Sequence, residues 1–167
     1  MKNLIKNVWT VLMLLGLFVV TTTTNADLTI SECSTGAECL DIGFQYGTGK
    51  GIKQDDFKAV KFYQKACDLK SGSGCFNLGL MYDTGKGIKQ DDFKAVKFYQ
   101  KACDLKSGSG CFNLGFMYDT GKGIKQDDFK AVKFYQKACD LKMDRVVLIL
   151  GLCMTLARAL NKMILKQ

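Results

Sequence analysis

The sequence predicts an all-α protein in which pairs of helices stack into a right-handed α/α solenoid. Residues 75–106 recur at 111–142 with a single difference, Leu80 against Phe116. A third copy begins at Cys39 and differs only in its first nine positions, so the period is 36 residues. Each copy carries two helical patterns, and one such pair cannot bury its apolar face alone. Three stacked pairs, about the minimum for a stable array, therefore form the expected fold.

The first helix of the second copy is expected over about residues 75–84. Its apolar side chains recur at the spacing of one helical face. Gly79 within it costs about 1 kcal/mol relative to alanine, which indicates a close approach to a neighbouring helix. The glycine-rich run 85–87 ends the helix, because glycine adopts positive φ freely. The apolar positions are Leu78, Met81 and Tyr82.

The second helix begins near a pair of aspartates and is expected to run to about Lys106. Asp91 or Asp92 caps it, because a carboxylate accepts hydrogen bonds from the free N–H groups of the first turn. Residues 107–110 are expected to form a loop to the next pair. The buried stripe consists of Phe93, Val96, Tyr99, Ala102 and Cys103, and the solvated one of Lys94, Lys97 and Lys101.

Residues 1–26 have the pattern of a cleaved export signal. Their apolar run, 8–20, is shorter than the roughly 20 residues of a membrane-spanning helix, which disfavours the alternative of an uncleaved anchor. The mature chain is expected to begin at Asp27, with 27–38 as an N-terminal segment, in the periplasm or outside the cell and with no stable membrane span. The positive region and the cleavage site are formed by Lys2, Lys6, Thr24 and Ala26.

The repeat has the pattern C-x-x-L-G-x-x-Y-x-x-G-x-G followed by D-x-x-K-A-x-x-x-Y-x-K-A-C. This pattern resembles the Sel1-like repeat, a relative of the tetratricopeptide repeat. With its cysteines and its export signal, the chain is similar to the Helicobacter cysteine-rich proteins. The resemblance spans residues 39–142. The repeats are expected at 39–74, 75–110 and 111–142.

The resemblance also implies how the cysteines pair. The family joins the end of one second helix to the start of the next first helix, across eight residues; the alternative is that these cysteines are core thiols. The implied pairs are Cys67–Cys75 and Cys103–Cys111. Cys39 occupies the equivalent position in the first repeat, but its expected partner position holds Ser31. Cys33 is the nearby cysteine that remains, so we predict Cys33–Cys39.

The tail, residues 143–167, departs abruptly from the repeat and could be read as an amphipathic membrane helix or a capping helix. A coding sequence for these residues, with synonymous codons chosen freely, can be translated in a reading frame shifted by one base. The translation is then GSGCFNLGLMYDTGKGIKQDDFKA, which is the repeat again. We interpret it as a fourth repeat displaced by a one-base deletion near Lys142, in a variant allele or through a sequencing error. Cys139 then loses its partner and Cys153 arises from the wrong frame, so the two either pair adventitiously or remain as thiols.

Composition argues against several functional classes. The chain has no His, which removes His-based zinc sites and Ser-His-Asp or Cys-His nucleophiles, so neither a metal nor a cofactor is expected. The net charge of +8 falls to +3 over residues 27–142, which disfavours nucleic acid as a partner. The glycine turn 47–51 lacks the G-x-x-x-x-G-K-[ST] phosphate-loop pattern, and we interpret it as a connection between helices.

Two functions remain from different classes. The Helicobacter resemblance implies a penicillin-binding protein with β-lactamase activity, but S-x-x-K, S-D-N and K-T-G are missing and no catalytic residue can be named. The alternative is a non-catalytic secreted scaffold whose concave surface binds an extended peptide, a peptidoglycan-like cell-wall fragment or a host protein. For the two tyrosines among its candidate contacts, ordinary core packing is the competing interpretation. The candidate contacts are Asn77, Tyr82, Asn113 and Tyr118.

Overall fold

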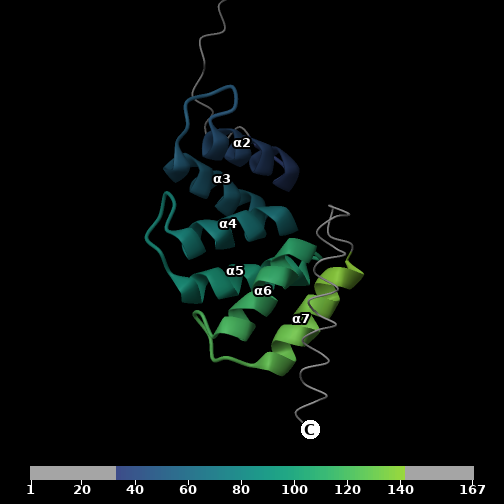
Figure 1. Cartoon of the computed structure of the whole chain (residues 1–167). Helices are drawn as coiled ribbons and strands as arrows, with labels where there is room; N and C mark the ends of the chain where they lie inside the picture. Colours follow the sequence, from purple (N-terminus) through teal and green to yellow (C-terminus); the bar gives the residue numbers. More distant parts are fainter. Residues whose placement is uncertain (1–32, 142–167) are drawn as a thin grey trace, which may run out of the picture.

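The computed structural model describes residues 33–141, which form six helices and no strand (Figure 1). The helices follow one another from top to bottom of Figure 1 in chain order, and each packs against the next. This arrangement confirms the expected all-α solenoid of helix pairs. The first helices of the pairs are α2 (Gly36–Thr48), α4 (Gly72–Thr84) and α6 (Gly108–Thr120); the second helices are α3 (Asp56–Asp68), α5 (Asp92–Asp104) and α7 (Asp128–Asp140).

The second helices begin at the second aspartate of each pair, and the first aspartate is the cap. The Asp91 carboxylate accepts a hydrogen bond from the Lys94 N–H at 2.9 Å, so Asp91 rather than Asp92 is the cap. It satisfies one of the N–H groups that have no partner within the helix. The helix ends at Asp104, two residues before the expected Lys106. Asp55 and Asp127 cap the other two second helices in the same way.

The first helices begin three residues earlier than their apolar pattern indicates. The Ser107 hydroxyl accepts a hydrogen bond from the Gly110 N–H at 3.2 Å, and α6 starts at Gly108. The expected loop 107–110 is therefore wrong: these residues are a serine cap and the first helical turn. Serine capping offsets the poor helix propensity of the two glycines, which is what the sequence pattern alone missed.

Within each pair the two helices meet at a glycine. A Cβ atom added at Gly79 would lie 2.8 Å from the Tyr99 ring, closer than packing allows. The absence of a side chain thus lets the tyrosine of α5 lie against the backbone of α4, which confirms the close approach expected at Gly79. The same contact recurs at Gly43 with Tyr63 and at Gly115 with Tyr135.

Successive pairs meet at small residues and a disulfide bond. A Cβ atom added at Gly74 would lie 2.6 Å from the Ala66 Cβ, so α4 approaches the end of α3 closely. The structure contains disulfides at the two places that the resemblance implies and at the predicted Cys33–Cys39, and each of these cysteines is buried. The Cα–Cα distances are 4.4 Å for Cys67–Cys75, 4.5 Å for Cys103–Cys111 and 5.2 Å for Cys33–Cys39.

The ends of the chain lie outside the described residues. The signal sequence, residues 27–32 of the N-terminal segment, the tail and Cys153 are among these ends, so their sequence-based assignments stay predictions. Cys139 is bonded in a disulfide. Its pairing with Cys153, which lies outside the described residues, stays a prediction.

One expected core residue is on the surface. Phe93 was placed on the buried stripe of α5 by its spacing, but its side chain is 60% exposed. That part of the expectation is wrong, because Phe93 is the second residue of α5 and lies in the turn that joins the helix to its connection. The other four stripe residues, Val96, Tyr99, Ala102 and Cys103, are buried.

Candidate functional site

The first helices share a solvent-facing stripe that we call the first-helix face. Its positions are spaced by four, three and four residues, so they lie on one side of each helix. All are exposed or half-buried, and only Asp41 among them is charged. The face consists of Ala37, Asp41, Phe44 and Thr48 on α2, Ser73, Asn77, Leu80 and Thr84 on α4, and Ser109, Asn113, Phe116 and Thr120 on α6.

These three stripes form a continuous layer, because α2 contacts α4 and α4 contacts α6. The layer offers hydroxyl and amide groups beside large apolar side chains. Leu80 is 38% exposed and Phe116 is 44% exposed. Groups of these kinds can bind an uncharged polar backbone and its apolar side chains together, which is what recognition of an extended peptide requires.

The structure separates the four candidate contacts into two kinds. Asn77 and Asn113 lie half-buried on the first-helix face. The Tyr82 ring instead stacks on Phe98 of its own pair, with ring centroids 5.4 Å apart, under the Lys94 ammonium. Tyr118 stacks on Phe134 in the same way, at 5.5 Å. The two tyrosines therefore hold each pair together.

Sequence reasoning missed the apolar members of the face. Leu80, Phe116 and Phe44 occupy equivalent positions in the three repeats and are all exposed. A signal in the sequence could have found them. Residues 75–106 and 111–142 differ at one position only, where the second copy has Leu80 and the third has Phe116. From Cys39 onward, the first copy also differs only within its first helix. All of this variation falls in the first helices, and two of the varied positions, those of Asp41 and Phe44, belong to this face.

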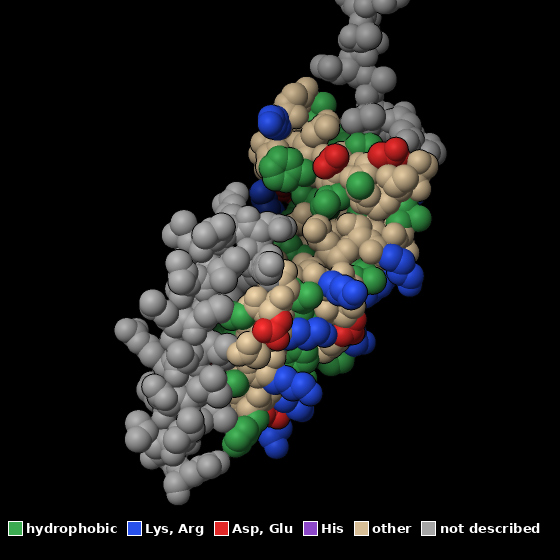
Figure 2. Space-filling view, turned by 90° about the vertical axis from the view of Figure 1, so that its right-hand side faces the viewer, with side chains coloured by type: hydrophobic (Ala, Val, Ile, Leu, Met, Phe, Trp, Pro, Cys, Tyr) green, Lys and Arg blue, Asp and Glu red, His purple; other side chains and the backbone are tan. Residues whose placement is uncertain are grey.

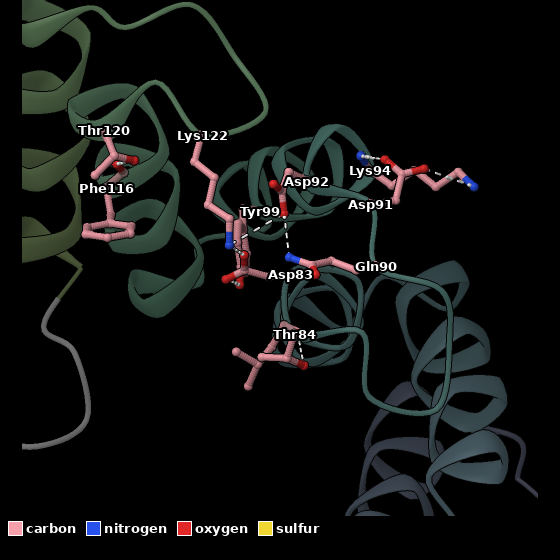
Figure 3. A network of polar contacts seen from close by, with 11 residues as sticks. Asp83, Thr84, Gln90, Asp91, Asp92, Lys94, Tyr99, Phe116, Thr120 and Lys122 are labelled. Carbon is pink, nitrogen blue, oxygen red and sulfur yellow. Dashed lines mark hydrogen bonds and ion pairs between the residues drawn. The ribbon is translucent and has the colours of Figure 1, made fainter.

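A network of charges joins adjacent repeats at the turn within each pair (Figure 3). The ammonium of Lys122, in the third repeat, is paired with Asp83 and lies 3.5 Å from the Asp92 carboxylate, both in the second repeat. The Tyr99 hydroxyl donates to Asp83 at 3.3 Å. Lys86 makes the equivalent contact one repeat earlier, with Asp56 at 3.3 Å. The network fixes the spacing of the repeats and hence of the stripes.

We expect the Lys122 contact to make stability depend on pH in the alkaline range. The hydrogen bond to Asp83 raises the pKa of Lys122 above 10.5. A lysine whose pKa is higher in the folded than in the unfolded state stabilises the fold fully when the pH is below its unfolded-state pKa. This stabilisation is lost as the pH rises through the folded-state pKa. Between pH 9 and 12, the unfolding temperature of Lys122→Met should therefore fall less than that of the wild type.

The control is Lys125→Met, which removes an exposed lysine of the same turn that makes no ion pair among the described residues. Its alkaline profile should follow the wild type, because Tyr99 and the other titrating groups are unchanged. Parallel wild-type and Lys122→Met curves by thermal circular dichroism would show that the contact contributes no pH-dependent stability.

The described residues offer no cluster of three or more His, Cys, Asp or Glu side chains that could bind a metal ion. The aspartate pairs cap helices or bind lysines. Of the glycine turn 47–51, Gly47 and Thr48 end α2, and the rest belongs to the connection from α2 to α3, with Gly49 and Gly51 at positive φ.

Comparison with known sequences identifies the repeat. The Sel1 repeat profile matches three times, at residues 39–71, 72–107 and 108–143. The chain belongs to the Sel1 repeat family. The second and third Sel1 matches begin three residues before the boundaries expected from the cysteines, at the first residue of α4 and of α6. A search of curated proteins finds no match.

Solved Sel1 structures show the same architecture. A Sel1 repeat protein from Oxalobacter formigenes superimposes with a TM-score of 0.64 at 28% identity, over 68% of this chain and 47% of that one. The protective antigen c5321 of uropathogenic Escherichia coli superimposes with a TM-score of 0.62 at 32% identity, over 64% of this chain and 23% of that one. Helicobacter pylori cysteine-rich protein B superimposes with a TM-score of 0.55 at 35% identity, over 64% of this chain and 83% of that one. This chain thus spans about half of the first relative and a quarter of the second.

Proposed function

We propose that this Sel1 repeat protein is a binding scaffold that takes an extended peptide on its first-helix face. One observation carries the proposal: helix sequence differs between repeats only in the first helices, whereas the second helices are identical in all three. Identical second helices suit a constant framework, and varied first helices suit a surface that reads a ligand. The face carries one charged side chain, the acidic Asp41, which favours a peptide backbone over a polyanion.

We also propose that the protein works outside the cytoplasm after removal of residues 1–26. Three disulfides lie among the described residues, and disulfides persist in oxidising compartments. No helix within residues 33–141 has the length and hydropathy needed to cross a bilayer. Secretion or a periplasmic location is tested by recovering the processed chain, beginning at Asp27, from the periplasmic or culture fraction.

A peptide selected on this protein from a phage library of random twelve-residue peptides is a suitable probe of the first-helix face. We expect the double variant Leu80→Glu, Phe116→Glu to bind a synthetic selected peptide at least tenfold more weakly, because an apolar contact is replaced by a charge. Affinity is measured by isothermal titration calorimetry with oxidised protein.

The matched control is Phe93→Glu, Phe129→Glu, which changes two exposed rings on second helices instead. It should retain the wild-type affinity. Equal weakening in both double variants, or in neither, would show that the peptide binds elsewhere.

The β-lactam activity that the Helicobacter resemblance implies is a separate matter. The sequence contains none of the serine β-lactamase elements, so we expect no turnover of a chromogenic cephalosporin above the buffer rate. Steady hydrolysis by the oxidised protein would establish an enzyme. Binding without hydrolysis would agree with the scaffold.

A further inference from the structure

A second surface lies on the other helix of each pair. Phe57, Phe93 and Phe129 are the second residues of α3, α5 and α7, and their rings are 61%, 60% and 70% exposed. These are the most exposed large apolar side chains among the described residues. A phenyl ring has no hydrogen-bonding group, so its exposure is a cost unless a partner covers it.

Each of these rings lies between two lysines. The lysine four residues after each ring lies on the same side of the helix. The lysine four residues before it lies in the turn that precedes the helix. All six are exposed, and none makes an ion pair among the described residues. We call this set the Lys–Phe ladder: Lys53, Phe57 and Lys61; Lys89, Phe93 and Lys97; Lys125, Phe129 and Lys133.

The ladder runs along one edge of the solenoid. The turns that precede α3, α5 and α7 all lie at the left of Figure 1. On the opposite side, shown in Figure 2, basic and acidic side chains are intermixed. There Lys101 pairs with Asp68 at 3.5 Å and Lys137 with Asp104 at 3.8 Å. The ladder edge thus carries six exposed lysines without an ion pair, beside the aspartates that cap α3, α5 and α7.

We propose that the Lys–Phe ladder docks the protein onto an anionic phospholipid surface. The six cations complement phosphate headgroups, each lysine near such a surface being attracted to it. The ammonium groups of Lys61 and Lys97 lie 4.5 Å from the centroids of Phe57 and Phe93, so a ring can enter the acyl boundary while its cation stays at headgroup depth. The three rings stand at equivalent positions of successive repeats along one edge, so all three can contact a deformable membrane surface at the same time. A rigid, curved protein partner would contact all three less readily.

Local fluorescence reporters test the ladder within the full chain. The chain has one tryptophan, Trp9, so Trp9→Phe gives a silent background. In that background Phe93→Trp places a reporter on the ladder, and Leu80→Trp places a matched exposed reporter on the first-helix face. Each is mixed with vesicles of 30% brominated phosphatidylglycerol in phosphatidylcholine, and with brominated phosphatidylcholine alone.

We expect the Phe93→Trp emission to shift to shorter wavelength and to be quenched by the anionic vesicles, with little change for Leu80→Trp. Replacing all six ladder lysines with glutamine should weaken partition of the ladder reporter at least tenfold and remove its dependence on salt. The proposal is overturned if the ladder reporter is not quenched by anionic vesicles, or is quenched equally by neutral ones. A blue shift with soluble heparin but not with vesicles would instead assign the ladder to an acidic polysaccharide.

Discussion

Replacing Gly87 with alanine should lower the free energy of unfolding by about 3–5 kcal/mol, among the largest effects of a single substitution. Gly87 has a φ of +68°, which already disfavours alanine. A Cβ atom there would also lie 2.3 Å from the Asp56 carbonyl oxygen and 2.4 Å from its carbonyl carbon. These backbone atoms begin the second helix of the preceding repeat, so the two repeats would have to separate.

Gly51→Ala is the matched control, because it stands at the equivalent position of the first repeat. Its φ is +82°, but nothing lies within 4 Å of its added Cβ atom. It should cost only the conformational penalty, about 1–2 kcal/mol. Urea unfolding followed by circular dichroism measures both variants. Equal losses at the two glycines would show that the contact between repeats contributes nothing.

Removing the Cys67–Cys75 bridge should be the second large effect. On the chain-entropy description, closing a loop of eight residues stabilises by about 2.5 kcal/mol. The double variant Cys67→Ala, Cys75→Ala should lose that amount. It should also unfold over a broader range of urea, because this bridge joins two neighbouring repeats and couples their unfolding.

The Cys33→Ala, Cys39→Ala variant supplies the comparison for that bridge. Its loop is slightly shorter, with a sequence separation of 6 against 8. Cys33 precedes the first described helix, so this bridge couples no two helix pairs. It should shift the midpoint without broadening the transition. If both double variants broaden the transition alike, the interrepeat bridge has no special role in cooperativity.

Local interactions explain why so much of the fold could be predicted from sequence. The period of 36 residues, the aspartate caps and the glycine at the helix crossing all depend on residues within one repeat. The errors occurred at helix ends. Because Ser107 caps α6, this helix begins at Gly108, earlier than its apolar pattern indicates. Phe93 lies in the first turn of α5, where its ring is exposed.

The candidate site was predicted only in part. Asn77 and Tyr82 were both assigned to the binding surface, yet five residues on a helix correspond to a rotation of about 140°. The asparagine therefore faces solvent, and the tyrosine stacks on Phe98. Helical periodicity predicts which residues share a side, but which side faces solvent depends on where the partner helix packs.

By itself, the sequence determined the repeat, its helix pairs and its family. Only the tertiary structure decided what each copy of the repeat touches. Gly51 and Gly87 lie in the same local sequence, G-K-G-I-K-Q-D-D, and both have positive φ. One borders open space and the other the backbone of Asp56, because only the second has a described helix pair before it in the stack. Identical sequences acquire different roles through their place in the array.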